Sequence, residues 1–152
     1  VIDATEWVGP YNDLTFGLHQ VAKYYYYPGW QEPGPTLEFI INKDAYEQLP
    51  PDLKEIVRAA ARTVNDDLLS EYTAKNNAAL KELVEVHNVE LRRLPDDVLA
   101  ALKIISEEVI AEIPGDDPLA QKIYKSYIEY RDSIESYQDI SERAYINARA
   151  AD

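Results

Sequence analysis

The pattern of apolar and polar positions changes near residue 43. The first 42 residues hold both Trp, both Phe and four of the five Gly. The rest of the chain is rich in Ala, Leu, Glu, Lys and Asp, and its apolar residues recur at steps of three and four. Such steps place apolar side chains on one face of a helix. We therefore expect strands and loops in residues 1–42 and helices in the remainder.

In the aromatic part, turn residues separate short elements. Asn12 or Asp13 can cap a short helix that continues through Leu18. Residues 21–27 are expected to form a strand, because aromatic side chains fit a pleated surface. A Pro-Gly pair follows this strand and ends it. Residues 36–41 alternate weakly between apolar and polar positions and are expected to form a second strand.

The remainder predicts four helices and a short strand. Pro is tolerated in the first turn of a helix, where its missing N–H costs nothing. The predicted elements are a short helix at 44–48 capped by Asn42, a long helix that Pro50-Pro51-Asp52 opens and that reaches about His87, a strand at 89–92, a helix from 95–97 to Ile113, and a last helix that Asp116-Asp117-Pro118 opens.

The last helix carries a narrow apolar seam. Its members alternate at steps of four and three, and they are Ile123, Tyr127, Tyr130, Ile134, Tyr137, Ser141, Ala144 and Ala148. A repeat of 3.5 residues is typical of a coiled coil. A continuous helix with this seam would run for roughly 40 Å. The seam predicts packing against another long helix, either in a second chain or in the 52–87 segment.

Composition excludes several classes of protein. The formal net charge of −13 disfavours binding to nucleic acid or to anionic membranes. No apolar run approaches the roughly 20 residues of a membrane-spanning helix. The chain has no Cys, which excludes disulfides and thiolate chemistry. It also has no Met, so we expect a further N-terminal portion in the complete protein.

Most candidate motifs have a simple structural interpretation. No glycine-rich phosphate loop, zinc-ligand spacing or nucleophile elbow is present in the sequence. His19 and His87 are isolated in sequence and are expected to be surface or half-buried residues rather than ligands. The pairs at 66–67, 96–97 and 116–117 resemble calcium loops only superficially. The last two precede or open helices, where carboxylates favour the N-terminus.

Two acidic segments with aromatic neighbours remain, Glu6-Trp7 and Trp30-Gln31-Glu32. A carboxylate in such a setting can act as a general acid in glycoside hydrolysis. It can also bind a hard cation, which prefers oxygen ligands. The third possibility is an ordinary surface Glu beside aromatic residues of the core. The residues by themselves leave all three open.

Two runs of sequence give a resemblance to a known family. They cover residues 2–13, which read IDATEWVGPYND, and residues 21–30, which read VAKYYYYPGW. Both are similar to the periplasmic solute-binding proteins of tripartite ATP-independent periplasmic (TRAP) transporters, in particular the subgroup that binds 2-oxoacids and other small monocarboxylates. The resemblance covers essentially the whole chain.

The resemblance implies a fold and an assembly. The expected class is α+β and predominantly helical, the C-terminal half of a two-lobe α/β periplasmic-binding-protein fold with a long C-terminal helix. Within it, residues 1–42 would hold the ligand site and crossing strands, and residues 43–115 a helical part of a lobe. Residues 116–152 would form the long last helix. The subgroup forms dimers by exchanging that helix, in agreement with the seam.

The resemblance also implies a site. Glu6 would bind a metal ion through its carboxylate. Trp7 would bind the ion through its backbone carbonyl and contact the substrate with its ring. Glu32 is a further candidate metal ligand, and Trp30 and Gln31 are candidate substrate contacts. The family also uses a Gln and an Arg that this chain lacks, since both come from earlier segments.

The charge of the chain supports a cation. An organic anion that approaches an acidic chain needs positive charge at its site, from a metal ion or from an Arg. The seven Arg lie in or beside the helical part of the sequence and are expected away from the aromatic segment; they are at positions 58, 62, 92, 93, 131, 143 and 149. We therefore expect sodium or calcium at Glu6, or an Arg supplied by the other half of the protein.

Three functions follow. The first is a periplasmic solute-binding protein, not an enzyme, that captures a small carboxylate such as a 2-oxoacid and delivers it to a TRAP membrane permease. The second is a helical interaction module that dimerises and binds no ligand of its own. The third is a carbohydrate-active enzyme that uses Glu6 and Glu32.

Overall fold

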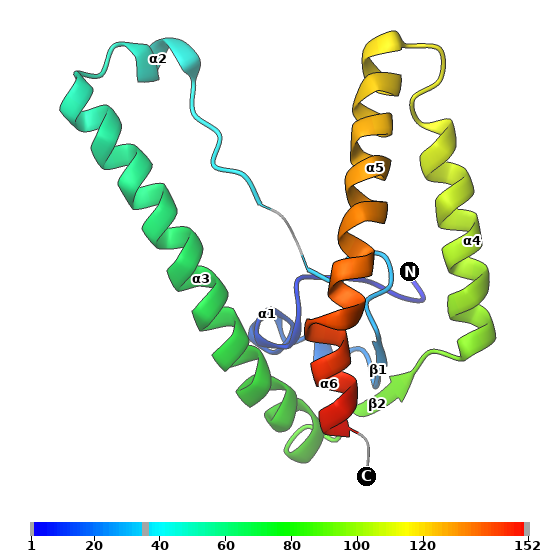
Figure 1. The fold of residues 1–152 in the computed structure, drawn as a ribbon. Helices are drawn as coiled ribbons and strands as arrows, with labels where there is room; N and C mark the ends of the chain where they lie inside the picture. Colours follow the sequence, from blue (N-terminus) through cyan, green and yellow to red (C-terminus); the bar gives the residue numbers. More distant parts are fainter. Residues whose placement is uncertain (1, 35–36, 151–152) are drawn as a thin grey trace. The chain divides into compact units, whose positions relative to one another are not determined.

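The computed structural model describes residues 2–34 and 37–150, which fall into two compact units, Val1–Pro95 and Asp96–Asp152. The first unit contains α1 (Pro10–Phe16), the 3₁₀ helix η1 (Leu18–Gln20), β1 (Tyr24–Tyr27), α2 (Lys43–Glu47), α3 (Pro51–Glu85) and β2 (Glu90–Arg93) (Figure 1). The second contains α4 (Asp96–Glu112), α5 (Pro118–Ile140) and α6 (Glu142–Ala150). The structure divides the chain after Pro95, whereas the segments expected from the sequence end at residues 42 and 115, each within one of the two units.

β1 and β2 form a parallel two-stranded sheet, close to the predicted positions at 21–27 and 89–92. Tyr24 pairs with Glu90 at one end and Tyr27 with Arg93 at the other. At the ends of the ladder, the N–H of Glu90 donates to the carbonyl of Lys23 at 2.9 Å, and the N–H of Leu94 donates to the carbonyl of Tyr27 at 2.8 Å. The pairing brings the tyrosine strand beside residues that follow the long helix.

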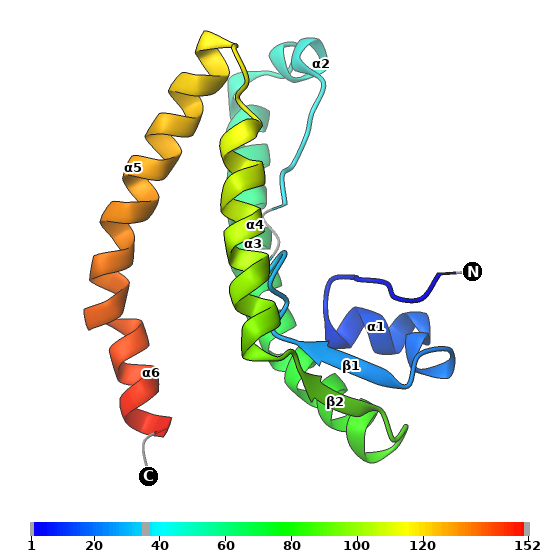
Figure 2. The ribbon, with the colours of Figure 1, turned by 90° about the vertical axis from the view of Figure 1, so that its right-hand side faces the viewer.

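Two of the buried apolar side chains of the first unit lie in the C-terminal part of α3. Ala79 and Leu83 on α3 are buried, and so is Val89, which lies just before β2. The short helix α1 lies against α3 (Figures 1 and 2). α3 confirms the predicted long helix, and its buried positions lie toward its C-terminal end.

The prediction of a strand at residues 36–41 is wrong for the part that the structure describes. Thr36 lies outside the described residues, and residues 37–41 form no regular element. Their apolar side chains are exposed, and they are Leu37, Phe39, Ile40 and Ile41. A strand needs a neighbour to accept and donate its backbone hydrogen bonds. The described sheet contains β1 and β2 and gives this segment no such neighbour.

The prediction of one continuous last helix is also wrong. α5 ends at Ile140 and α6 begins at Glu142, because Ser141 departs from helical geometry with φ −111° and ψ −105°. The Ser141 hydroxyl donates to the carbonyl of Tyr137 at 2.7 Å. Its N–H instead donates to the carbonyl of Gln138 at 3.3 Å. A side-chain hydrogen bond to the carbonyl four positions earlier competes with the helical bond and favours a bend. Thr63 and Thr73 make the same kind of bond inside α3, which continues, so the Ser141 hydroxyl accompanies the break and does not by itself account for it.

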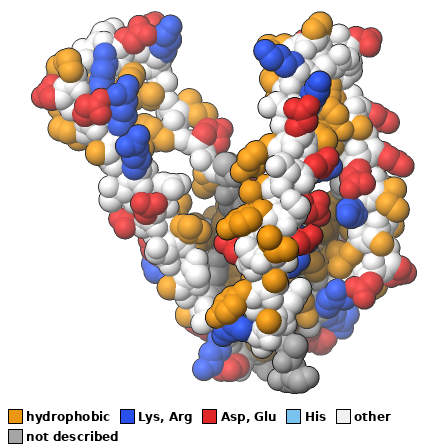
Figure 3. Space-filling model, in the orientation of Figure 1, with side chains coloured by type: hydrophobic (Ala, Val, Ile, Leu, Met, Phe, Trp, Pro, Cys, Tyr) orange, Lys and Arg blue, Asp and Glu red, His pale blue; other side chains and the backbone are white. Residues whose placement is uncertain are grey.

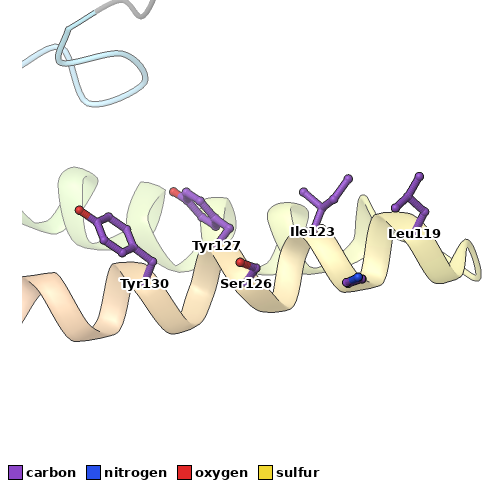
Figure 4. A pocket seen from close by; sticks show the side chains of 6 residues that line it. Leu119, Ile123, Ser126, Tyr127 and Tyr130 are labelled. Atoms are coloured by element: carbon purple, nitrogen blue, oxygen red, sulfur yellow. The ribbon is translucent and has the colours of Figure 1, made fainter.

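Apolar side chains of the seam lie on the surface of α5. Ile123, Tyr127, Tyr130 and Tyr137 are all exposed. Figure 4 shows Leu119, Ile123, Tyr127 and Tyr130 pointing to the same side of the helix, where they line a shallow groove of about 510 Å³. Hydrophobic side chains also line α5 in the space-filling view (Figure 3). Of the helices in the described residues, none is long and apolar enough to cross a membrane.

Candidate functional site

The Glu6-Trp7 segment lies immediately before α1 and is joined to it by an aromatic contact. The rings of Trp7 and Phe16 meet edge to face, with centroids 5.5 Å apart and an angle of 87° between their planes. Trp7 remains half exposed. The carboxylate of Glu6 is exposed and has no hydrogen-bond or ion-pair partner among the described residues. It is therefore free to bind a ligand.

Tyr11 fixes α1 to α3. Its backbone N–H donates to Oδ1 of Asn76 at 3.0 Å, which satisfies one of the free N–H groups at the start of the helix. Its hydroxyl accepts from Nζ of Lys75 at 3.2 Å, and its ring meets Tyr72 edge to face at 6.0 Å. Gly9 has φ +153°, and a Cβ there would lie 3.4 Å from Oδ1 of Asn76. The chain leaving Trp7 is thus held closely against α3.

A partly buried hydrogen bond joins α1 to β1. The hydroxyl of Tyr25 donates to Oδ2 of Asp13 at 2.5 Å. Asp13 is only 6% exposed, and its other carboxylate oxygen has no partner among the described residues. Burial raises the pKa of Asp13, and the hydrogen bond from Tyr25 opposes that rise. Burial, together with the neighbouring carboxylate, also raises the pKa of Tyr25.

Sequence reasoning missed this pair. It considered Asp13 only as a possible helix cap, whereas α1 begins at Pro10 and is preceded by Gly9. Tyr25 stands in a run of four tyrosines, so no property of the sequence separates it from its neighbours. Strand alternation indicates only weakly that Tyr25 differs from its neighbours. Every second side chain of a strand faces the same side, so Tyr25 faces the side opposite to Tyr24 and Tyr26.

The second predicted segment follows β1 and forms a tight bend. A Cβ on Gly29 would lie 3.4 Å from the carbonyl oxygen of Glu32. Trp30 is 44% exposed. Gln31 and Glu32 are exposed, and neither side chain has a partner among the described residues. All the predicted site residues therefore lie on the surface, in two segments that flank the joined elements α1 and β1.

The donor set suits a hard cation but is incomplete. Glu6, Glu32 and the carbonyl of Trp7 are oxygen donors, which sodium and calcium prefer. Calcium takes about six to eight oxygen ligands, more than these residues supply. Among the residues that the structure describes, no group of three or more His, Asp or Glu could hold a metal ion. An ion at Glu6 would therefore need further oxygens from the ligand, from water or from another segment.

Arg92 corrects the expectation that every Arg lies away from the aromatic segment. Because β2 pairs with β1, the guanidinium of Arg92 lies 3.6 Å from the centre of the Tyr24 ring. It also forms an ion pair with Glu90 at 2.8 Å, and Glu90 in turn contacts Lys23 at 2.7 Å. These cations lower the pKa of Glu90 through hydrogen bonding. Arg92 is thus close to the tyrosine strand, but it already has a carboxylate partner.

The two histidines are separate in sequence but not in space. Their rings stack with centroids 3.9 Å apart. As expected, His19 is half-buried and His87 lies at the surface.

Two of the three Asp pairs lie at the starts of helices, as a structural role predicts. Asp96 and Asp97 begin α4, and the carboxylate of Asp117 accepts from the N–H of Leu119 at 2.8 Å at the start of α5.

Comparison with known proteins identifies the family. Residues 1–115 match the model of bacterial extracellular solute-binding protein family 7. The chain belongs to this family. It is 36% identical over 146 residues to the monocarboxylate 2-oxoacid-binding periplasmic protein of Nostoc sp. (strain PCC 7120), a match that covers 96% of this chain and 40% of that protein. The family is one of solute-binding proteins and not of enzymes.

Two solved structures share the fold. One is a TRAP periplasmic solute-binding protein from Pseudoalteromonas atlantica with bound sodium and pyruvate, with a TM-score of 0.87 and 39% identity over 96% of this chain and 44% of that one. The other is a TRAP transporter solute-binding protein from Bordetella bronchiseptica, a dimer of mixed occupancy with calcium and picolinate bound at one site. Its TM-score is 0.90 with 31% identity, over 99% of this chain and 46% of that one.

These matches confirm the predicted family and the mainly helical α+β class within a two-lobe binding-protein fold. The chain spans less than half the length of the relatives that it matches. The resemblance seen in residues 2–13 and 21–30 therefore pointed to the correct family.

Proposed function

We propose that this chain forms one wall of a carboxylate-binding site in a periplasmic solute-binding protein. The protein captures a small monocarboxylate, such as a 2-oxoacid, and delivers it to a TRAP membrane permease. The observation that carries the proposal is the unpartnered carboxylate of Glu6 beside the half-exposed ring of Trp7. The ligands named for the relatives, pyruvate, picolinate and 2-oxoacids, support the substrate class.

A cation mediates binding in this proposal. A chain of net charge −13 repels an anionic substrate unless positive charge lies between them. Glu6, the carbonyl of Trp7 and Glu32 would supply oxygen ligands to sodium or calcium. The rings of Trp7 and Trp30 and the amide of Gln31 would contact the substrate. The sodium and calcium named for the two solved relatives support this assignment.

The proposed activity is binding without catalysis. A carbohydrate-active site would need one of Glu6 and Glu32 to act as a general acid, which an enzyme keeps protonated by apolar surroundings. Both side chains are exposed to solvent instead. The family description, which names solute binding, favours the same conclusion.

Replacing Glu6 tests the site. In the complete gene product, Glu6→Gln removes the charge that holds the cation and keeps the size of the side chain. We expect pyruvate affinity, measured by calorimetry in sodium or calcium, to fall about tenfold or more, as for other changes around metal sites. Glu38→Gln is the matched control, because Glu38 is also exposed and has no described partner. Wild-type affinity in Glu6→Gln would show that the site is wrongly assigned.

A second candidate function is self-association. The exposed apolar side chains of α5 favour it, since an apolar surface gains free energy when it leaves water. The chain would then act as a helical dimerisation module, with or without ligand. The Bordetella relative is described as a dimer, which supports this possibility.

A further inference from the structure

The two segments of the proposed site lie next to elements that a partly buried hydrogen bond joins. Glu6 and Trp7 lead directly into α1, and the Trp7 ring packs on Phe16 near the end of that helix. Trp30 to Glu32 follow directly after β1. Figure 2 shows α1 next to β1, and the hydrogen bond from Tyr25 to Asp13 joins them. A change in this contact would therefore alter the placement of one segment relative to the other.

The chemistry of the contact is unusual for a part of the fold that serves only packing. Asp13 is 6% exposed, and a buried carboxylate loses its hydration. Well-packed apolar residues in place of buried charges are often neutral or stabilising. A hydrogen bond to a carboxylate, by contrast, is short, strong and directional. The pair of Asp13 and Tyr25 thus fixes α1 relative to β1, and it does so with a loss of folding stability.

Tyr25 is distinct within the tyrosine strand. It is half-buried, whereas Tyr24, Tyr26 and Tyr27 are all more than 40% exposed. Its hydroxyl reaches Asp13 on α1, whereas the ring of Tyr24 is contacted by Arg92. The bend at Gly29 begins only two residues after the strand, so the position of β1 carries over to Trp30 through a short connection.

We propose that Asp13 and Tyr25 are positioning residues, whose hydrogen bond holds the Glu6-Trp7 segment and the Trp30–Glu32 segment at the spacing that carboxylate binding needs. This inference rests on the proposed function. Neither residue touches the ligand in this proposal. Each acts through the element that carries it, Asp13 through α1 and Tyr25 through β1.

Four variants separate positioning from folding. Tyr25→Phe removes only the hydroxyl, and Asp13→Leu removes the acceptor at similar size. Asp13→Asn keeps an oxygen acceptor for Tyr25 and is the conservative rescue. Tyr24→Phe is the matched control, because Tyr24 lies on the same strand but is exposed. Circular dichroism first establishes a temperature at which every variant is folded.

Two measurements are made at that temperature on the complete gene product. The first is pyruvate affinity by calorimetry with sodium or calcium present. The second is ¹⁹F NMR after incorporation of 5-fluorotryptophan, with the signals of Trp7 and Trp30 assigned by replacing each with Phe. The Trp7 signal reports on the Glu6-Trp7 segment, and the Trp30 signal reports on the Trp30–Glu32 segment. Both signals can be measured without ligand.

Tyr25→Phe and Asp13→Leu are expected to weaken binding about tenfold, the effect typical of residues that orient metal ligands. They should also shift or broaden the Trp7 and Trp30 signals, whereas Asp13→Asn and Tyr24→Phe should leave both readouts as in the wild type. Lower melting temperatures with unchanged affinity and unchanged signals would overturn the proposal. If the wild type binds no carboxylate, the proposed function fails, and the fluorine signals alone decide whether the hydrogen bond positions the two segments.

Discussion

Asp13 is the one charged side chain that is buried among the residues the structure describes. Its burial favours the protonated form, which raises its pKa above the ordinary value of 3.8. The hydrogen bond from Tyr25 favours the ionised form and limits the rise. The folded state therefore binds the Asp13 proton more tightly than the unfolded state does.

This difference predicts how Asp13 affects stability as pH changes. Because the folded-state pKa is raised, the stability that Asp13 contributes is fully present below pH 3.8 and is lost as pH rises through the folded-state pKa. Asn at this position does not titrate and keeps an acceptor for Tyr25. Urea unfolding followed by circular dichroism should therefore show Asp13→Asn gaining stability over the wild type as pH rises toward neutrality.

The exposed Asp67→Asn on α3 is the control for loss of a negative charge. Its difference from the wild type should vary less with pH. A stability difference between Asp13→Asn and the wild type that stays constant from pH 3.8 to neutrality would contradict the prediction.

For single residues, the sequence predicted contacts between near neighbours in the chain better than contacts between residues far apart in it. Asn42 was expected to cap α2, and its side chain accepts from the N–H of Ala45 at 3.0 Å. A cap depends on residues two or three positions away, so its pattern is visible in the sequence. The pairing of Asp13 with Tyr25 depends on how α1 packs beside β1. No local pattern contains that information.

The periodicity of the sequence predicted the two strands and the helix α3, but it did not predict that the strands pair with each other. Both strands of the described sheet and the helix α3 lie close to their predicted positions. The parallel pairing of β1 with β2 requires α3 as the crossover, and sequence periodicity does not specify the register. That pairing is what brings Arg92 onto the ring of Tyr24, so the position of this Arg could not be predicted.

Ser141 lies where the periodicity of the seam failed to predict a break. The seam predicted a single helix, and the helix is interrupted at Ser141, whose hydroxyl donates to the Tyr137 carbonyl. We expect this bond to favour the break. Ser141→Ala removes this competing bond, and Ala also favours a helix by about 0.5 kcal/mol relative to Ser. We expect stronger helical circular dichroism at 222 nm and a slightly higher melting temperature. Ser133→Ala, at an exposed position within α5, isolates the propensity effect. Equal gains in the two variants would mean that the hydroxyl does not cause the break.

For the whole molecule, exposed apolar surface is the main feature that sequence alone could not locate. The chain spans less than half the length of its matched relatives. Residues 37–41 and the seam of α5 both expose large apolar side chains. Sequence identified these residues as apolar and assigned them to a strand and a helix seam. Their exposure depends on which segments pack against them.

The seam leads to a prediction about assembly. Ile123, Tyr127 and Tyr130 line an open groove on α5, and a second copy of α5 would bury them. We expect the protein to self-associate, as measured by sedimentation velocity over a range of concentrations. Higher salt should strengthen the association, because it screens the repulsion between chains of net charge −13.

The double variant Tyr127→Glu with Tyr130→Glu would place two unpaired carboxylates in that interface. Burial of unpaired charge costs several kcal/mol, so the dissociation constant should rise on the order of a hundredfold or more. Ser136→Glu adds negative charge to an exposed position on the side of α5 away from the seam and should leave a dimer in place. If the wild type sediments as a monomer at its highest soluble concentration, or if the double variant associates as strongly as the wild type, then the α5 groove is not a self-association surface.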